Sequence, residues 1–475
     1  MSEIRELYEA NSQGQVFEFY DSLTDAEKTS LEKQASAIDL NEIADLTSTL
    51  TQNPDHETSE FLETVEPADY VPLETNEGGD PARWVEAQTK GEEALRAGRV
   101  AAFTVAGGQG TRLGYNGPKG TFGVSPILKK SLFQIFAEKI LASSKIFGHS
   151  IPWFIMTSQS NHDDTIRFFE QNHYFGLSSD QVTLFSQGVM PAVDEEGKIL
   201  LEGKSKIALS PDGHGGSLRA LVRSGATRQM EAAGIDIISY FQVDNPLVRC
   251  IDPAFIGFHL EGNSELSSKM VTKAYASEKV GVFCQSGNKT HVVEYSDLPN
   301  ELAEAIDANG KLLYRSGSIA VHLFNRDFVD RIGSGTDKSG QLPFHLANKK
   351  VPFIDSNGNK KTPKTSNAYK FEMFVFDALP FANNPVIIET AREDDFSPVK
   401  NAEGIDSAQS SRDDQLRQFA RWAASAGIKL ETNESGIPAV AFEISPLFGD
   451  TAERFASSWD ALENKTELTE GIVLA

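Results

Sequence analysis

Hydrophobic residues along this chain form short continuous runs that alternate with longer stretches at helical spacing. The continuous runs, which are typical of strands buried on both faces of a parallel sheet, are the first half of Val100–Lys119, then Trp153–Thr157, Gln181–Ser186 and Ile235–Val243. Between them, residues 131–144 and 161–172 carry apolar side chains at helical spacing. This alternation predicts an α/β fold with a doubly wound sheet that binds ligands at the carboxyl ends of its strands.

The segments on either side of this alternating region have different patterns. Residues 3–50 and 84–95 show helical spacing, and Thr24 and Glu27 have the spacing of a capping box. From 270 to 383 the pattern is strand-rich, with a polar loop expected over 362–370. After 411 a helix and a short strand over 439–444 are expected. We therefore predict a helical N-terminal domain over 1–98, an α/β domain over 99–395 and a small C-terminal domain over 396–475.

Charge excludes some classes of partner. The 475-residue chain has a formal net charge of −24, and most of the excess lies in residues 1–98. An acidic surface repels nucleic acid and anionic membranes, so neither is an expected partner. Cys250 and Cys284 are the only cysteines. Together with the lack of a long apolar run or a secretory leader, they predict a cytoplasmic protein.

A glycine-rich segment follows the first predicted strand. Glycines between 107 and 114 let backbone N–H groups approach an anion, and Arg112 and Lys119 add cationic donors. Leu113 stands where a dinucleotide fingerprint has its third glycine, and no Lys-Ser/Thr pair of a P-loop is present. A plain turn is the alternative interpretation. The two cations favour a phosphate-binding loop.

Other candidates follow later strands. Asp244 comes after the 235–243 strand, where a carboxylate can hold Mg²⁺ or merely cap a turn. The amide of Gln187 is suited to the edge of a base. Gly213 lies in a second glycine-rich turn, in which His214 is either functional or a polar turn residue. Lys400 follows a proline and, taken alone, has the pattern of a surface residue.

Several motifs together resemble a known family. Residues 106–114, Ala-Gly-Gly-Gln-Gly-Thr-Arg-Leu-Gly, followed by Pro-Lys-Gly at 118–120, resemble the signature of the UDP-sugar pyrophosphorylases. The Gln-Gly-Thr-Arg form is most similar to the UDP-N-acetylglucosamine branch. Further similar segments lie at 187–188, 211–216, 243–245, 293–295, 370–377, 392–401 and 443–446.

The resemblance implies a fold and an activity. The fold is a Rossmann-like nucleotidyltransferase core with a mixed sheet, a helical N-terminal domain and a small C-terminal α+β domain. The implied reaction joins UTP to a sugar 1-phosphate and releases pyrophosphate, with Mg²⁺ as cofactor. A monomer or a weak homo-oligomer is expected.

The resemblance also implies roles for matching residues. Arg112, Lys119 and Lys400 are the implied catalytic cations at the phosphates, and Asp244 is the implied Mg²⁺ ligand at the nucleotide. The residues implied to hold the uridine are Ala106, Gly107, Gly108, Gln187 and Gly213. The residues implied at the sugar or its phosphate are His214, Glu294, Tyr295, Ser318, Lys370, Phe374 and Phe376. Phe374 and Phe376 either face the sugar or fill the core.

Two positions depart from the N-acetylglucosamine branch, which has Asn where this chain has His214 and Ser318. Both positions lie near the sugar in the family, so a UDP-glucose or broad-specificity pyrophosphorylase is an alternative. A UDP-sugar-binding regulatory protein without catalysis is another. A glycosyltransferase is disfavoured because Asp244-Asn-Pro246 does not supply a D-x-D metal motif.

Overall fold

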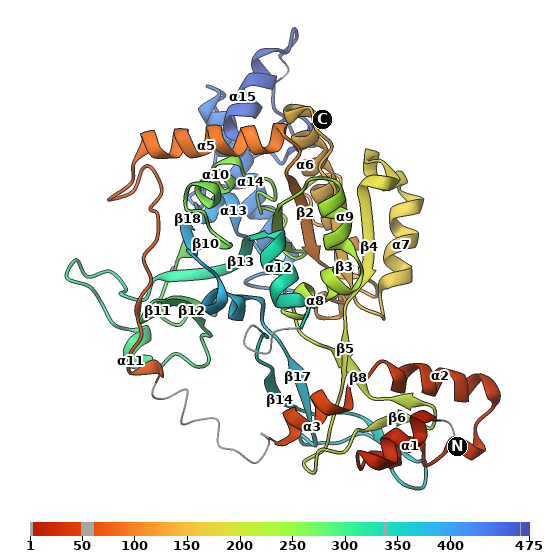
Figure 1. Ribbon diagram of the computed structural model, residues 1–475. Helices are drawn as coiled ribbons and strands as arrows, with labels where there is room; N and C mark the ends of the chain where they lie inside the picture. Colours follow the sequence, from red (N-terminus) through yellow and green to blue (C-terminus); the bar gives the residue numbers. More distant parts are fainter. Residues whose placement is uncertain (1–2, 49–60, 336–340, 466) are drawn as a thin grey trace. The chain divides into compact units, whose positions relative to one another are not determined.

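The computed structural model describes residues 3–48, 61–335, 341–465 and 467–475 (Figure 1). The chain packs as two units. Unit 1 consists of Met1–Thr64, Gln187–Ser217 and Gln341–Asp377, and unit 2 consists of Val65–Ser186, Leu218–Gly340 and Ala378–Ala475. This division does not follow the predicted boundaries at 98 and 395, because the N-terminal hundred residues contribute to two separate cores.

Unit 2 is built on a ten-stranded sheet. Seven strands follow the order β1-β11-β13-β9-β2-β3-β4, while β10 pairs with β13 and β18, and β12 pairs with β11. The bounds are β1 (Glu66–Pro67), β2 (Val100–Val105), β3 (Trp153–Thr157), β4 (Val182–Ser186), β9 (Ile237–Gln242), β10 (Leu266–Thr272), β11 (Val282–Ser286), β12 (Lys289–Val293), β13 (Ser316–Asn325) and β18 (Val386–Glu389). Strands β9, β2, β3 and β4 are parallel, whereas β13 is antiparallel to β9 and β10. The predicted mixed sheet is confirmed.

Helices surround this sheet, and Figure 1 shows α7 beside β4 and α5 beside α10. Those wholly in unit 2 are α5 (Pro81–Arg96), α6 (Leu132–Phe147), α7 (His162–Gln171), α9 (Ala226–Ala232), α10 (Pro253–Glu261), α11 (Asn300–Ala303), α12 (Arg326–Gly333), α13 (Arg392–Asp395), α14 (Ala408–Ser425) and α15 (Ala452–Asp460). The 3₁₀ turns are η3 (Thr111–Leu113), η4 (Lys119–Thr121), η5 (His173–Gly176) and η6 (Ser179–Gln181). Helix α8 (Gly216–Arg223) and turn η8 (Val375–Phe381) begin in unit 1 segments and end in unit 2.

Local signals explain where the main helices begin and end. Helix α6 starts where the Ser131 hydroxyl accepts a hydrogen bond from Gln134 N, and it ends at Gly148, whose φ of 67° suits a left-handed cap. The C-terminal part of unit 2 has its own apolar core, formed by α14, α15 and the paired strands β19 (Glu443–Ile444) and β20 (Val473–Leu474). The strand predicted over 439–444 is therefore only its last two residues.

Helices α5 and α10 approach each other through glycine. A Cβ on Gly91 would overlap the carbonyl of Pro253, and a Cβ on Gly257 would overlap the carbonyl of Ala87. The two backbones are thus in direct contact, which explains why α5 packs in unit 2 although it lies within the predicted N-terminal domain.

Unit 1 combines N-terminal helices with short strands from two later segments. Its helical elements are α1 (Glu3–Ala10), η1 (Gly14–Phe17), η2 (Tyr20–Ser22), α2 (Asp25–Ser36) and α3 (Leu40–Ser48). Its strands are β5 (Val189–Pro191), β6 (Leu201–Gly203), β7 (Lys206–Ile207), β8 (Leu209–Pro211), β14 (His345–Lys349), β15 (Phe353–Ile354), β16 (Lys360–Lys361) and β17 (Ala368–Glu372). They pair as β5–β8, β6–β7, β14–β17 and β15–β16. The predicted capping box is confirmed at the start of α2.

The apolar core of unit 1 explains why three separate segments of the chain pack together. Tyr8, Phe17 and Leu31 are buried against Ile199 and Phe371. The N-terminal helices therefore lack a core of their own.

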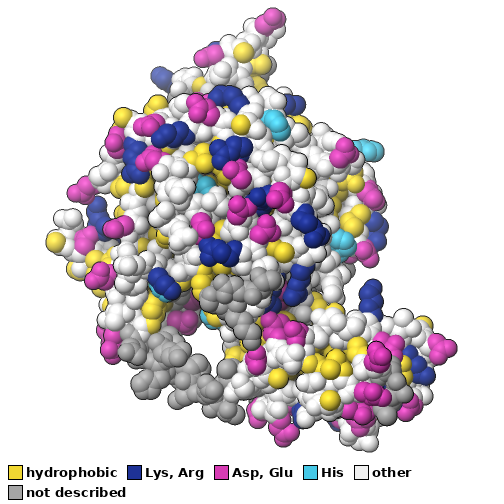
Figure 2. Space-filling view, viewed as in Figure 1, with side chains coloured by type: hydrophobic (Ala, Val, Ile, Leu, Met, Phe, Trp, Pro, Cys, Tyr) yellow, Lys and Arg dark blue, Asp and Glu magenta, His cyan; other side chains and the backbone are white. Residues whose placement is uncertain are grey.

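Basic and acidic side chains are interspersed over the face of unit 2 that Figure 2 shows. Within the described part of the chain, no helix is long and apolar enough to cross a membrane. Cys250 and Cys284 are both buried free thiols.

Candidate functional site

The glycine-rich loop leaves the carboxyl end of β2. Ala106 is fully buried, Gly107 is half-buried and Gly108 is exposed. The buried side chain of Asn161 holds this bend: its Nδ2 donates to the carbonyl oxygens of Ala106 at 3.0 Å and Gly108 at 3.3 Å. The loop backbone is therefore fixed while Gly108 stays open to solvent, as a phosphate-binding turn requires.

The loop then folds back on itself. The backbone N–H of Lys119 donates to Gly108 O at 3.0 Å, which brings the start of η4 beside the glycines. Arg112 lies on η3 and is exposed, and no hydrogen bond or ion pair of its guanidinium is found among the described residues. It is therefore available to an anionic ligand.

Lys119 meets Asp244 at the carboxyl end of the neighbouring strand. Strands β2 and β9 run in parallel, and Val243 N donates to Val105 O at 3.1 Å beyond the last paired residues. Lys119 Nζ lies 3.1 Å from Asp244 Oδ2, and the two side chains are only 16% and 15% exposed. The loop cation and the strand-end carboxylate, which were predicted separately, are therefore direct neighbours.

Lys400 completes this charged cluster. Burial by itself would raise the pKa of the Asp244 carboxyl, but the ammonium groups of Lys119 and Lys400 outweigh it and lower this pKa below its ordinary value. The chain reaches Lys400 through Val399, whose N–H donates to Asp244 O at 2.8 Å. The surface interpretation of Lys400 is therefore wrong, because contacts distant in sequence place it beside Asp244.

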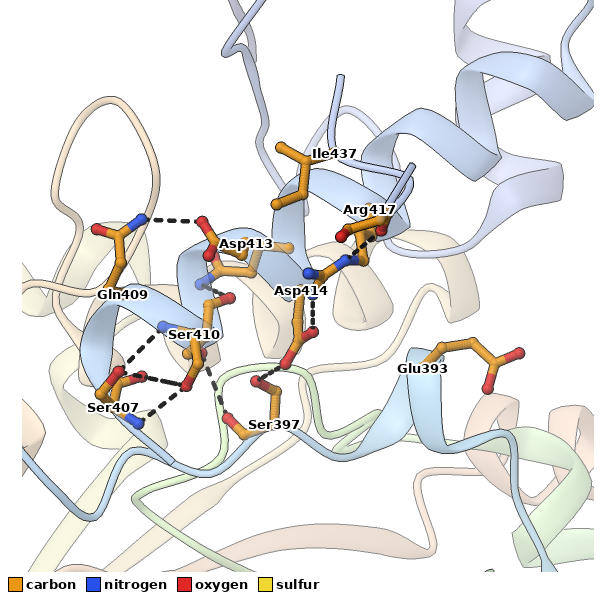
Figure 3. Close-up of polar contacts among 12 residues, drawn as sticks. Glu393, Ser397, Ser407, Gln409, Ser410, Asp413, Asp414, Arg417 and Ile437 are labelled. Atoms are coloured by element: carbon orange, nitrogen blue, oxygen red, sulfur yellow. Dashed lines mark hydrogen bonds and ion pairs between the residues drawn. The ribbon is translucent and has the colours of Figure 1, made fainter. Parts of the chain in front are cut away.

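The segment before Lys400 is anchored to α14. Figure 3 shows Ser397 beside Asp414, where Ser397 Oγ donates to Asp414 Oδ2 at 2.7 Å. Asp414 is also paired with Arg417, and the capping box of Ser407 and Ser410 starts the helix. The N-terminal end of α14 thus helps to fix the Lys400 segment.

The donor set fits one kind of Mg²⁺ site. The described residues contain no cluster of three or more His, Cys, Asp or Glu side chains that would enclose a metal. Mg²⁺ in nucleotide enzymes is often held by one or two carboxylates while phosphates and water complete its coordination. Asp244, which is ionised and close to two phosphate-binding candidates, suits such a site.

A second group of candidate residues lies in unit 1. Gln187 Nε2 donates to Asp212 Oδ1 at 2.9 Å and to Gly213 O at 2.8 Å. Both amide hydrogens are thus used, and no described residue donates to Gln187 Oε1, which leaves an acceptor for a base N–H. Gly213 has a φ of 82°, and a Cβ there would overlap the carbonyl of Met373. Only glycine fits this turn.

His214 belongs to an aromatic stack. Its ring is stacked on Phe374 with 5.4 Å between centroids, and Phe374 is also stacked on His345 with 4.4 Å between centroids. Phe376 contacts both His214 and Phe374 and is buried. Phe376 therefore fills core, whereas the half-buried Phe374 belongs to the histidine stack.

The surroundings of His214 keep its imidazole neutral. Val375 N donates to His214 Nδ1 at 3.2 Å, so the ring proton is on Nε2. Burial, reinforced by the neighbouring His345, lowers the pKa of His214 to about 4. The imidazole is then a neutral hydrogen-bond donor at physiological pH.

This pKa predicts a pH dependence of stability. The imidazole takes up its proton near pH 6.5 in the unfolded chain but only near pH 4 in the folded protein. The contribution of neutral His214 to stability is therefore fully present above pH 6.5 and declines as the pH falls toward 4. Between about pH 7 and pH 5 the free energy of unfolding of the wild type should fall because of this histidine. In His214→Asn the fall over the same pH range should be smaller by roughly 1–2 kcal/mol. Urea denaturation at both pH values measures this. Equal pH dependence in the two proteins would contradict the assignment.

The remaining predicted residues lie on several strands. Lys370 is on β17 of unit 1, which corrects the loop expected over 362–370. Glu294 and Tyr295 follow β12, and Tyr295 is 47% exposed. Ser318 on β13 donates its N–H to Gly281 O at 2.8 Å. The structure thus places Lys119, Asp244 and Lys400 together in unit 2, and Gln187, Gly213, His214 and Phe374 together in unit 1.

Several residues that hold these groups are not among the predicted site residues. Asn161 was assigned only to the start of a helix, although its side chain fixes the glycine loop. Asp212 lies inside the recognised 211–216 motif and ties Gln187 to that turn. His345 had no motif around it, and its place beside Phe374 depends on the pairing of β14 with β17.

The motifs noted in the sequence are matched by a family model. The UDPGP model, described as UTP--glucose-1-phosphate uridylyltransferase, matches residues 55–418. The chain belongs to this family. The resemblance inferred from the glycine loop and the other motifs is thereby confirmed.

Proteins named as N-acetylglucosamine or N-acetylhexosamine pyrophosphorylases, or as pyrophosphorylase-like, match nearly the whole chain. The chain is 36% identical to UDP-N-acetylhexosamine pyrophosphorylase-like protein 1 of Xenopus tropicalis, over 96% of this chain and 94% of that one. It is 34% identical to a probable UDP-N-acetylglucosamine pyrophosphorylase of Dictyostelium discoideum, over 94% and 93%. A solved UDP-N-acetylglucosamine pyrophosphorylase of Trypanosoma brucei matches with a TM-score of 0.83 and 26% identity, over 100% of this chain and 99% of that one.

Proposed function

We propose that this protein is a UTP:sugar-1-phosphate uridylyltransferase that forms UDP-N-acetylglucosamine and pyrophosphate. The observation that carries the proposal is the cluster of Lys119, Asp244 and Lys400 beside the glycine loop of a UDPGP-family chain. Two cations close to an ionised carboxylate that follows β9 suit a triphosphate with its metal.

The proposed reaction is one in-line displacement. An oxygen of the sugar 1-phosphate attacks the α-phosphorus of UTP, the bond to the β-phosphate oxygen breaks, and pyrophosphate leaves. No protein nucleophile is needed, since positioning and charge stabilisation account for most catalysis of phosphoryl transfer. Arg112, Lys119 and Lys400 would offset the negative charge that develops on the phosphates. Mg²⁺, when bound at Asp244, would add charge neutralisation between phosphate oxygens.

The uridine and sugar contacts are proposed by family resemblance. Gln187 Oε1 would accept from the base, and the backbone of Gly213 would lie against it. For the sugar end we propose Glu294, Ser318 and His214, and for its phosphate Lys370.

A non-catalytic binding protein is the main alternative, and one relative is itself named pyrophosphorylase-like. A protein that only binds a UDP-sugar would not need cations for pyrophosphate. The near-buried pairing of Lys119 with Asp244 therefore favours catalysis over binding alone.

We expect N-acetylglucosamine 1-phosphate to be the preferred substrate. Pyrophosphate release from UTP and Mg²⁺ should be measured in parallel with N-acetylglucosamine 1-phosphate, glucose 1-phosphate and galactose 1-phosphate. The variants His214→Asn and Ser318→Asn restore the residues of the N-acetylglucosamine branch and should change this preference little. A wild-type preference for the hexose phosphates would support the UDP-glucose or broad-specificity alternative, and uridine binding without turnover would support the regulatory protein.

A further inference from the structure

A buried ion-pair network in unit 2 is not used in the proposed reaction. Its centre is the ammonium group of Lys269 on β10, a side chain with no exposed surface. Lys269 Nζ donates to Asp252 Oδ2 at 2.7 Å and to Asp395 Oδ2. Burial would lower the pKa of Lys269, but the two carboxylates outweigh it and raise this pKa, so the lysine stays charged.

Such a network is an inefficient source of stability. A buried ion pair is often no more stabilising than apolar side chains of the same volume, because desolvation offsets the attraction between the charges. The network does impose geometry, since each buried carboxylate oxygen must meet a donor. The role of the network therefore lies in the segments that its two carboxylates hold in place.

Asp395 connects Lys269 to the candidate catalytic cluster. Its side chain also accepts from Arg249 N at 2.7 Å and from Thr390 Oγ1 at 2.8 Å. Its backbone oxygen accepts from Asn245 Nδ2 at 2.7 Å. Asn245 directly follows Asp244, the candidate Mg²⁺ ligand. Asp395 of the network is therefore hydrogen-bonded to the residue next to that candidate ligand.

Asn245 links the same network to Lys400. Its Oδ1 accepts from Ser397 N at 2.9 Å, and Val399 N donates to Asp244 O at 2.8 Å. Hydrogen bonds thus hold the segment from Asp395 to Lys400 against the turn at Asp244. A shift of Asp395 would move Lys400 relative to Asp244.

Asp252 shares the lysine but not these connections. Its Oδ1 accepts from Ala254 N at 3.1 Å as the N-cap of α10, and it lies 3.5 Å from the Arg249 guanidinium. Among the described residues, no hydrogen bond joins it to the 395–400 segment. Asp252 therefore provides a matched control within one network.

We propose that Asp395, held by Lys269, is a positioning residue that sets the place of Lys400 relative to Asp244. The proposal rests on the uridylyltransferase function above. Asp395 does not touch the reacting phosphates, and its effect on turnover passes through Asn245 and the 396–400 segment.

The test compares Asp395→Asn with Asp252→Asn. Either asparagine turns an N–H group toward Lys269. At 395 the change also opposes the bond from Thr390, whereas at 252 the oxygen that caps α10 is kept. We expect Asp395→Asn to lower kcat by about 10²-fold with KM for the sugar phosphate within about threefold, as for a misplacement of about 1 Å. Asp252→Asn should keep kcat within about threefold of wild type, although both variants lower Tm.

A milder variant covers the case in which Asp395→Asn does not fold. Thr390→Val removes one hydrogen bond to Asp395 without changing any charge, and the backbone N–H of residue 390 keeps its bond to Met270 O. It should lower kcat by about fivefold and lower Tm less than Asp395→Asn does, since the carboxylate loses one donor but keeps its bonds to Lys269 and Arg249 N.

Calorimetric titration with UTP and Mg²⁺ gives a reading that needs no turnover. Affinity should fall by about tenfold in Asp395→Asn and stay near wild type in Asp252→Asn, because only the first displaces Lys400. If kcat and UTP affinity fall equally in both variants, in step with Tm, the network is only structural and the proposal is wrong. If the wild type releases no pyrophosphate but the titration still separates the variants, the proposed function fails while the positioning role is supported.

Discussion

The Lys119→Ala variant is expected to lose about 10²-fold or more in kcat, comparable to the removal of one preorganised donor from an oxyanion site. The substitution removes a cation of the phosphate loop and also the nearest partner of Asp244, 3.1 Å away. Initial rates of pyrophosphate release at saturating UTP and sugar 1-phosphate measure the effect.

The matched control for this variant is Lys145→Ala. Lys145 is exposed in the last turn of α6, so its removal changes the same charge without touching the loop. Turnover of Lys119→Ala close to that of the control would exclude Lys119 from catalysis.

Asp244→Asn is expected to reduce kcat by about 10²- to 10³-fold and to raise the Mg²⁺ concentration needed for half-maximal activity. The amide keeps the shape of the side chain but supplies no charge to a metal. It also removes the carboxylate charge that attracts the ammonium groups of Lys119 and Lys400. Rates measured over a Mg²⁺ titration separate the two effects.

Asp236→Asn is the control for Asp244→Asn. Asp236 lies just before β9, at the opposite end from Asp244, and forms a half-exposed pair with Arg99. Its loss should leave both kcat and the Mg²⁺ requirement unchanged. An unaltered Mg²⁺ response in Asp244→Asn would show that the metal is held elsewhere.

The parallel centre of the fold could be predicted from the sequence because its strands are buried on both faces. The run Trp153–Thr157 forms β3 with the same bounds, and β2 begins at Val100, where its predicted run begins. The packing of the N-terminal helices could not be predicted. Helical spacing shows that one face of a helix is apolar, but Tyr8 and Phe17 meet partners such as Phe371 that are hundreds of residues away in the chain.

The candidate site was predictable where motif and position coincide. Asp244 and the glycine loop are both at the ends of parallel strands, so their proximity follows from the topology. Lys400 has no such signal, since its surroundings depend on hydrogen bonds made by Asn245 and Ser397. The two- and three-residue strands of unit 1 are too short to give a periodic pattern. The five-residue β17 forms by pairing with β14, and no pattern around Lys370 indicates this pairing.

The glycines between α5 and α10 reverse a common expectation about protein engineering. Replacing glycine inside a helix with alanine usually stabilises that helix by about 1 kcal/mol. At Gly91 and Gly257 the added methyl group would collide with a carbonyl of the opposite helix, and backbone, unlike a side chain, cannot rotate away. Consensus or propensity-guided thermostabilisation should therefore leave these two positions unaltered, even though each is formally a weak point of its own helix.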